Sequence, residues 1–370
     1  MNIFLATFLT DLILFIVGFF VMYRAGENNF SNLFCMLLGI ANGFGYIAAS
    51  LISGKIVNQK TSKPILIIST IVTVASCIAL LCLKDFLSNF LLLVLMGAST
   101  SFYFNAFQSF IRNTSSRGEI FKTMSTYTFT WNSGIALGFL SSGSLYRAGP
   151  VALSVLMVIC GIAIMGIINA RRVSAETAVD NEAHSFNANP FYLWVGWIMI
   201  FSVNSVERSI QTFFPVISAQ NNLSPFLSGI PLFLLMAAQG TFSLYLAKKK
   251  NLFYNKKAAL LINLSGLLIF TALWLYPSYI TYLVCFFLTG LYGSFCYMSA
   301  VVYANNHHEN RSHNVGINET LVGISGITGV AMSSFFMEYF PGAGSLYLIC
   351  ALYIVAAIVY ISLIPEHKKA

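Results

Sequence analysis

Long apolar runs alternate with short polar interruptions from one end of the chain to the other. Each run is about twenty residues, which is the length that a helix needs to cross a bilayer core. The runs are continuously apolar and do not alternate with a period of two, so they indicate helices and not the strands of a barrel. The pattern predicts twelve spans: 3–22, 32–54, 64–83, 88–111, 124–146, 150–170, 191–214, 225–247, 257–276, 279–303, 315–337 and 345–364.

Composition agrees with this pattern. Of the 370 residues, 57% are hydrophobic and only 9% are charged, whereas roughly a quarter of the residues in soluble domains are charged. The sequence therefore predicts an all-α integral membrane protein that is surrounded by membrane lipids.

The longest polar segment, "ARRVSAETAVDNEAHSFNANP" from Ala170 to Pro190, separates six spans from six. Its acids, amides and small residues are typical of a solvated linker. We therefore predict an N-terminal six-helix bundle at 1–170, a cytoplasmic linker at 171–190 and a C-terminal six-helix bundle at 191–370.

The distribution of lysine and arginine predicts the orientation, because loops on the cytoplasmic side are enriched in both. Arg24, Lys84 and Arg147 fall on the other side and Arg208 lies within a span. With both termini in the cytoplasm, the inside loops hold 16 of the 20 basic residues: Lys55, Lys60, Lys63, Arg112, Arg117, Lys122, Arg171, Arg172, Lys248, Lys249, Lys250, Lys256, Lys257, Arg311, Lys368 and Lys369.

The net charge of +8 follows from this topology and does not indicate a nucleic-acid partner, since the basic residues lie in short loops without interleaved aromatics. The short loops and tails favour a bacterial cytoplasmic (inner) membrane. We expect a monomer.

An internal repeat relates the two halves. When the second half is shifted back by 193 positions, "ENNFSNLF" at 27–34 falls on "QNNLSPFL" at 220–227, and "GASTSF" at 97–102 falls on "GLYGSF" at 290–295. The same shift places Lys55 on Lys248, Lys63 on Lys256 and Asp11 on Asn204. A parallel repeat of this kind predicts a pseudo-two-fold axis along the membrane normal and a binding site between the halves near the midplane.

With twelve spans, two halves, a central linker and a basic turn after the second span, the chain resembles the major facilitator superfamily. The turn of that family usually reads Gly-x-Leu-Ala-Asp-Arg-x-Gly-Arg-Lys. Here it reads "GKIVNQKTSKP" at 54–64. Gly54 and Lys63 fit, whereas Asn58 stands where the family has its acid.

The resemblance implies a secondary transporter that moves a small organic solute by alternating access. The fifth span, "GIALGFLSSG" at 134–143, is glycine-rich, as in the proton-driven exporters of the family, but it lacks their Gly-Pro pair, so it favours export only slightly. The departures in the turn leave a second interpretation open, in which a similar fold serves as a lipid translocase or as a receptor that does not transport.

Ionised side chains within the spans are candidates for function, because each costs about 2.5–3.5 kcal/mol at the centre of a helix. In the seventh span, Asn204, Glu207, Arg208 and Gln211 follow helical spacing and form one polar stripe, which must face the bundle interior or a wet cavity. Arg208 is a candidate counter-charge to a carboxylate or an anionic substrate. The alternative is an ion pair that only orients this helix.

Two further acids are candidates for proton coupling, together with Glu207. Asp11 lies in the middle of the first span, with Thr7 one turn before it. A buried carboxylate without a counter-charge tends to take up a proton, although a neutral aspartic acid that ties helices together is also consistent. Glu319 enters the eleventh span beside Asn314 and Asn318, where a cap or helix-dipole role is the alternative.

Amides and aromatics in other spans are candidates for the substrate cavity, because they suit a hydroxylated or heterocyclic solute. Plain packing is the alternative for the aromatic residues. The candidates are Asn105 and Gln108 in the fourth span, Tyr127, Trp131 and Asn132 in the fifth, and Asn42 and Tyr46 in the second.

The chain lacks the motifs of an enzyme or an ATPase. It has no phosphate-binding glycine loop and no HExxH, and no histidine lies in a span to complete a Ser–His–Asp set. We expect no cofactor and no metal, although His307, His308 and His313 share one loop. The seven cysteines are expected to be small packing residues. Energy for transport must then come from a gradient, such as one of protons.

Overall fold

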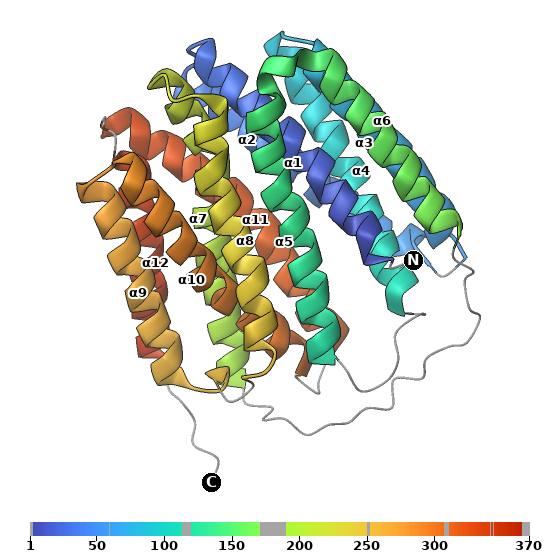
Figure 1. Ribbon diagram of the computed structural model, residues 1–370. Helices are drawn as coiled ribbons and strands as arrows, with labels where there is room; N and C mark the ends of the chain where they lie inside the picture. Colours follow the sequence, from blue (N-terminus) through green and yellow to red (C-terminus); the bar gives the residue numbers. More distant parts are fainter. Residues whose placement is uncertain are drawn as a thin grey trace. The chain divides into compact units, whose positions relative to one another are not determined.

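The structure is a computed structural model that describes residues 3–58, 60–112, 120–170, 190–249, 252–306, 311–340, 342 and 344–364. Every regular element in these ranges is helical (Figure 1). The elements are α1 (Phe4–Glu27), α2 (Asn32–Ile56), α3 (Ser62–Cys82), α4 (Phe86–Arg112), α5 (Ile120–Leu145), the short 3₁₀ helix η1 (Tyr146–Ala148), α6 (Gly149–Asn169), α7 (Pro190–Gln220), α8 (Pro225–Leu246), α9 (Lys256–Leu275), α10 (Tyr279–Asn306), α11 (Arg311–Tyr339) and α12 (Ser345–Leu363).

Within the described residues, ten segments are long and apolar enough to cross a membrane, by length and composition. One of them, Ser125–Asn169, combines most of α5 with η1 and α6. Helix α7 is not among the ten, because the polar residues at its centre lower its hydropathy. The chain is thus a multi-pass helical membrane protein, and α7 is a helix whose apolar sequence is interrupted by polar residues.

The helices form two compact units. The first comprises 1–123, 130–181 and 212–233, and the second comprises 124–129, 182–211 and 234–370. Residues 124–129 of α5 therefore belong to the second unit, and the end of α7 with the beginning of α8 belongs to the first. The linker predicted at 171–190 lies outside the described residues, except for Pro190. The predicted division at 170 and 191 stays a prediction.

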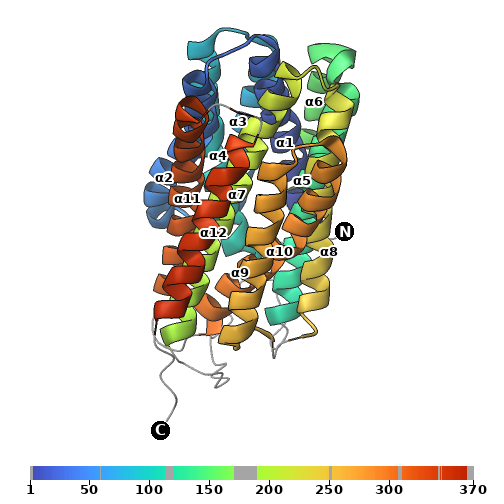
Figure 2. The same ribbon diagram turned by 90° about the vertical axis from the view of Figure 1, so that its left-hand side faces the viewer.

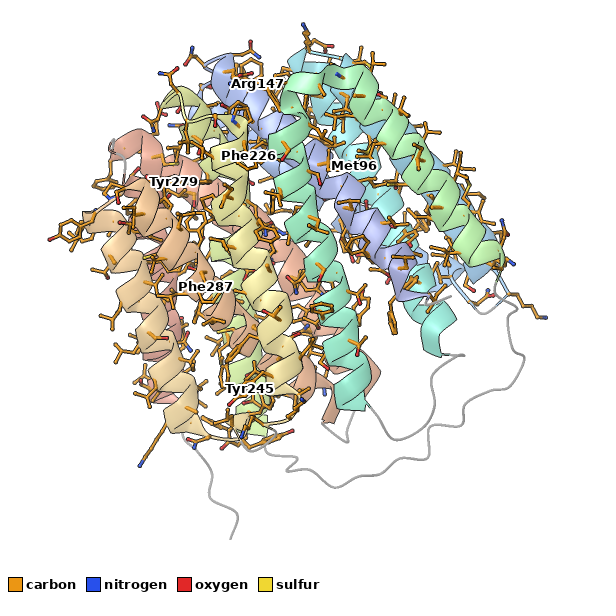
Figure 3. The ribbon with its side chains drawn as sticks, viewed as in Figure 1. Met96, Arg147, Phe226, Tyr245, Tyr279 and Phe287 are labelled. Carbon is orange, nitrogen blue, oxygen red and sulfur yellow. The ribbon has the colours of Figure 1, made fainter. Side chains whose placement is uncertain are left out.

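In the first unit, α4 packs most extensively against α2 and α3, and α3 also packs against α6 (Figure 1). Glycines allow the closest approach. A β-carbon on Gly97 of α4 would overlap the carbonyl oxygen of Asn42 in α2, and one on Gly45 would overlap that of Val94. Buried Met96, which Figure 3 labels, lies next to this crossing.

In the second unit, α9 packs between α12 and α10, and α11 contacts both α10 and α12 (Figure 2). The glycine contact recurs here. A β-carbon on Gly290 of α10 would overlap the carbonyl oxygen of Leu235 in α8. Gly290 and Leu235 lie 193 residues after Gly97 and Asn42, so the same backbone contact joins the corresponding helices in each unit.

A lysine contact recurs at the same offset. Lys63 at the start of α3 donates from Nζ to the carbonyl oxygen of Asn169 (3.1 Å), at the end of α6. Lys256 at the start of α9 donates from Nζ to those of Ser362 (3.3 Å) and Ile364 (2.8 Å), at the end of α12. Residues 256 and 362 are residues 63 and 169 plus 193. A lysine in this position satisfies carbonyl groups that the helix end leaves unpaired.

The turns after α1 and α7 are also equivalent. Asn29 and Asn222 are the described non-glycine residues with positive φ, at 52° and 57°, and asparagine tolerates this left-handed conformation well. In the next helix, the Ser31 hydroxyl accepts a hydrogen bond from the Phe34 amide (3.3 Å), and the Ser224 hydroxyl accepts one from the Leu227 amide (3.4 Å). The repeat seen in the sequence is thus present in local hydrogen bonds.

Large apolar side chains remain exposed on both units, as lipid-facing helices require. In the second unit, Phe287 of α10 is 44% exposed and Tyr245 of α8 is 50% exposed (Figure 3). In the first unit, Leu51, Ile68, Leu87 and Val151 are more exposed still.

Candidate functional site

The four polar residues of α7 point in different directions. Asn204 is half-buried, and its Nδ2 donates to the carbonyl oxygen of Val322 (2.7 Å) and to Oγ of Ser325 (2.9 Å), both in α11. It therefore ties α7 to α11. Arg208 is exposed, and its Nη1 donates to Oε1 of Gln211 (3.3 Å). Gln211 Nε2 in turn contacts Met236 Sδ of α8 at 3.7 Å.

Glu207 points into the second unit, with only 7% of the residue exposed. Its carboxyl group packs against Gly293 of α10, where a β-carbon would overlap Oε1. The side chain of Gln239 of α8 is within hydrogen-bond reach of the carboxyl and lies beside the same glycine, with Nε2 3.5 Å from the position of that β-carbon. Helices α7, α8 and α10 therefore meet at one acid.

Two titratable groups of α10, Tyr292 and Cys296, also lie near Glu207. The Tyr292 hydroxyl donates to Oδ1 of Asn263 in α9 (3.2 Å). Its ring lies against Gly266 of the same helix, where a β-carbon would be 2.9 Å from Cε2. The surroundings of Glu207 are thus fully buried and contain mostly neutral groups, with Arg208 as the adjacent cation.

Asp11 is buried in the first unit, with 5% exposed, and Thr7 one turn earlier is also buried. The backbone of α1 approaches α5 closely here, because a β-carbon on Gly134 would be 3.1 Å from Asp11 Cβ. Tyr103 of α4 lies near Asp11 and Thr10. The Thr10 hydroxyl itself donates to the carbonyl oxygen of Ala6 (2.9 Å).

The candidates on α4 and α2 form a smaller polar group in the first unit. Asn105 is half-buried, and its Nδ2 donates to Oγ of Ser53 in α2 (2.7 Å) and of Ser101 (3.4 Å). Asn42 and Tyr46 are half-buried on α2. Gln108 lies on α4, but its side chain is outside the described residues.

The candidates on α5 differ in burial. Tyr127 and Trp131 are half-buried, and Asn132 is fully buried. Thr128, one residue after Tyr127, contacts Met298 Sδ of α10 at 3.9 Å. The start of α5 is therefore packed into the second unit.

On α11, Glu319 is half-buried, whereas its neighbours Asn314 and Asn318 are buried. No helix cap formed by Glu319 is present among the described residues, and its role stays a prediction.

The turn between α2 and α3 holds its shape through asparagine instead of an acid. Asn58 Oδ1 accepts hydrogen bonds from the amides of Lys60 (2.9 Å) and Thr61 (3.1 Å). Gly54 lies in the last turns of α2, and Lys63 makes the helix-end contact described above. Asn58 therefore stabilises the turn without adding a charge to it.

Candidate metal ligands are not clustered in the part of the chain that the structure describes, where no group of three His, Cys, Asp or Glu could hold an ion. His307 and His308 lie outside the described residues, and so does the side chain of His313. All seven cysteines are free; six are buried as expected, but Cys82, at the end of α3, is exposed.

Sequence reasoning overlooked Gln239 and Gly293. Gln239 is a lone amide in the apolar segment "LFLLMAAQGTF" of α8 and could have been noticed as an intramembrane polar residue. Gly293 gives no such signal, because a glycine in a membrane helix is ordinary and its contact with Glu207 depends on tertiary structure.

These features define a class: a polytopic helical membrane protein whose charged and amide side chains lie in the middle of its helices, as in transporters. The family model of the Major Facilitator Superfamily matches residues 3–308. The chain belongs to the Major Facilitator Superfamily, and it is a transporter and not an enzyme.

Two solved structures have the same fold. The crystal structure of the nucleoside transporter NupG is 13% identical, covers 100% of both chains and has a TM-score of 0.71. That of a NupG mutant is 12% identical, covers 98% of this chain and 99% of its own, and also has a TM-score of 0.71. At this identity the likeness shows the fold alone. No curated protein sequence matches the chain significantly.

Proposed function

We propose that this protein is a proton-coupled secondary transporter that moves a small polar organic solute by alternating access. In this proposal twelve spans form two six-helix bundles related by a pseudo-two-fold axis. The monomer lies in a bacterial cytoplasmic membrane with both termini in the cytoplasm, where positively charged loops are favoured.

The observation that carries the proposal is the position of Arg208. This residue lies near the centre of α7 and is exposed, and Gln211 is its hydrogen-bond partner. A guanidinium that faces lipid at this depth costs about 2.5–3.5 kcal/mol even on insertion scales. We therefore expect Arg208 to face water, which supports a hydrated substrate path along this face of the second unit.

The substrate class follows from the groups that the path offers. Arg208 and Gln211 supply a charged donor and an amide, which can bind hydroxyl, carbonyl or carboxylate oxygens. Trp131 and Tyr127 on α5, Asn132 beside them and the half-buried Asn42, Tyr46 and Asn105 add candidates for stacking and hydrogen bonding. Nucleosides are the first candidates to test, because NupG, which has the same fold, is a nucleoside transporter.

Protons are the proposed driving ion, and Asp11 is the leading site. It is buried in a membrane helix next to the close contact with Gly134, so its environment changes whenever α1 and α5 separate. Glu207 is the second site and Glu319 the third. A carboxyl that takes up a proton on one side and releases it on the other couples solute movement to the gradient.

The proposal can be tested with the purified full chain in proteoliposomes. A ligand-induced thermal-shift screen over nucleosides, sugars, amino acids, organic acids and cationic drugs first selects a solute. Counterflow of that labelled solute then measures transport without a gradient, and an imposed pH gradient of either sign measures coupling and direction. The Asp11→Asn variant is expected to keep counterflow. Its solute accumulation under the pH gradient should be at least tenfold lower than that of the wild type.

Each part of the proposal has its own contradicting outcome. Unchanged accumulation by Asp11→Asn rejects Asp11 as the coupling site. Absence of counterflow for every solute class, together with movement of labelled lipid between leaflets, identifies a lipid translocase instead. Lys84→Ala, which changes a basic residue in a loop, serves as the control variant that should transport normally.

A further inference from the structure

The surroundings of Glu207 contain two hydrogen-bond acceptors that no described group satisfies. Oε1 of Glu207 and Oε1 of Gln239 are both shielded from solvent and have no hydrogen-bond partner among the described residues. The two residues are 7% and 1% exposed. A buried acceptor without a donor is costly. These two oxygens therefore need a hydrogen-bond donor that the described groups do not provide.

One neighbouring donor is already engaged. The Tyr292 hydroxyl, on α10, already donates to Asn263 Oδ1. A β-carbon on Gly293 would overlap Glu207 Oε1, so the carboxyl oxygen packs directly on the α10 backbone. A proton on the carboxyl itself is the smallest group that provides the missing donor.

We propose that Glu207 and Gln239 form a carboxylic acid–amide pair that holds one proton between α7 and α8, with the carboxyl group packed against Gly293 of α10. The protonated carboxyl donates to the amide oxygen of Gln239, and the amide nitrogen donates to the other carboxyl oxygen. Two parallel hydrogen bonds then satisfy every polar atom of the pair. Gln239 is a positioning residue in this arrangement, and Glu207 is the residue that binds the proton.

The equivalent positions of the first unit show that the pair is specific to the second. Subtracting 193 from 207, 239 and 293 gives Leu14, Tyr46 and Thr100. Leu14 is buried, and the Thr100 hydroxyl bonds to its own helix, at the carbonyl oxygen of Met96. The first unit thus has a leucine, a tyrosine and a threonine at these positions, whereas the second unit has an acid, an amide and a glycine.

Loss of the proton removes one of the two hydrogen bonds. The amide nitrogen of Gln239 can still donate to the carboxylate, but the amide oxygen and the second carboxylate oxygen are both acceptors and repel each other, so the α7–α8 contact weakens. The charged and titratable groups around the carboxyl are Arg208 on α7 and Tyr292 and Cys296 on α10, while α8 contributes the neutral Gln239. Among the described residues around this carboxyl, Arg208 is the cation that a carboxylate formed here would have as its neighbour.

This inference deepens the proton coupling proposed above and rests on it for its use in transport, but the pair itself can be tested without transport. The melting temperature of the purified full chain in detergent is measured from pH 5 to pH 10 for the wild type, Glu207→Gln, Gln239→Glu and the swap Glu207→Gln/Gln239→Glu. The wild type is expected to melt at lower temperature as the pH rises. Glu207→Gln is expected to lose this dependence.

The swap distinguishes a mutual pair from two independent residues. It places the amide on α7 and the acid on α8, so it should restore both the melting temperature and the pH dependence that Gln239→Glu alone, with two facing acids, disturbs. A swap variant as impaired as the two single variants combined overturns the proposal, and so does a Glu207→Gln variant with the wild-type pH profile.

Infrared spectroscopy provides a readout that does not depend on the variants folding. Wild-type protein with ¹³C-labelled glutamate should show the carbonyl band of a protonated glutamic acid at neutral pH, and this band should persist in Glu319→Gln. Its absence from the wild type overturns the proposal. Transport by the wild type is measured separately, so a functioning proton-driven carrier without this band rejects the pair and leaves the proposed function intact.

Discussion

The first unit and the second unit use the same contacts between helices but different side chains where those helices meet. The glycine crossing at Gly97 recurs at Gly290, and the lysine at position 63 recurs at 256, each with its partner shifted by the same 193 residues. In α1 and α7, Leu14 of the first unit corresponds to Glu207 of the second. The contacts between helices are therefore shared by the two units, whereas the side chains that supply chemistry differ.

The intramembrane acids of α1 and α7 illustrate the same difference. Asp11 corresponds to Asn204 at the offset of 193 residues. Asp11 lies against Gly134 of α5, and Asn204 lies near Gly326 of α11, where a β-carbon would be 3.7 Å from its Nδ2. The amide at 204 ties α7 to α11, and the acid of α7 lies one turn further along. Each unit therefore has a buried acid, but the two acids have different neighbours.

The largest effect is expected from the contacts that the two units share. Gly97→Ala and Gly290→Ala each place a methyl group on a carbonyl oxygen of the neighbouring helix, so each should lose about 2–3 kcal/mol of unfolding free energy. Thermal unfolding in detergent measures both. Gly18→Ala is the control, because nothing lies within 4 Å of a β-carbon there. If one of these substitutions stabilises the protein and the other destabilises it, the two helix crossings are not equivalent.

A smaller effect is expected when a residue of the first unit is placed in the second. Gly293→Thr introduces the residue found at Thr100 and forces the Glu207 carboxyl away, which should cost about 1–2 kcal/mol. Adding Glu207→Leu, the residue found at Leu14, should recover part of this loss, because leucine and threonine already occupy the corresponding positions of the first unit. A double-mutant cycle measures the coupling. Strict additivity of the two changes would contradict contact between these positions.

The repeat and the helices could be predicted from sequence, because both depend on residue type along the chain. The ends of the helices could not. The first span was expected to end at 22, but α1 continues to Glu27, since Arg24 donates to the carbonyl oxygens of Leu80 and Leu81 and to Asn89. The seventh was expected to end at 214, but α7 continues past Pro215 to Gln220.

The neighbours of the polar residues also could not be predicted. Helical spacing placed Glu207 and Arg208 on one polar stripe, but it could not show that Arg208 is exposed while Glu207 packs on Gly293. Such contacts depend on which helices adjoin α7 and at what height. The same reason explains why Gln239, in a neighbouring helix 32 residues away in sequence, was not connected with Glu207.

Removing either lysine contact should lower the free energy of unfolding by about 1 kcal/mol or less, because each lysine supplies a helix-end hydrogen bond and a favourable interaction with the helix dipole. Lys256 donates to two carbonyl oxygens at the end of α12, and Lys63 donates to that of Asn169 at the end of α6, so Lys256→Met and Lys63→Met should each lower the melting temperature. Lys257→Met is the matched control, because this neighbouring side chain is exposed. A larger loss from Lys257→Met than from Lys256→Met would show that charge alone, and not the helix-end contact, accounts for the effect.

The smallest effect is expected at the caps that begin α4 and α10, where the two units differ in a single charge. Asp85 Oδ1 accepts a hydrogen bond from the Ser88 amide (2.8 Å), and 193 residues later Ser278 Oγ accepts one from the Thr281 amide (3.3 Å). The hydrogen bonds from Ser88 hold the pKa of Asp85 below its usual value, which is about 4.

An acid whose pKa is lower in the folded state stabilises the protein above its unfolded pKa, and this contribution is lost as the pH falls through the folded value. Asp85→Ser converts the first cap into the second. Its deficit in melting temperature relative to the wild type should therefore be present at pH 7 and disappear on acidification below about pH 4. The loss from Ser278→Ala, about half a kcal/mol, should stay constant over the same range, because its hydroxyl does not titrate. An Asp85→Ser deficit that persists unchanged at pH 3 would mean that the charge of Asp85 contributes nothing to the difference between the two caps.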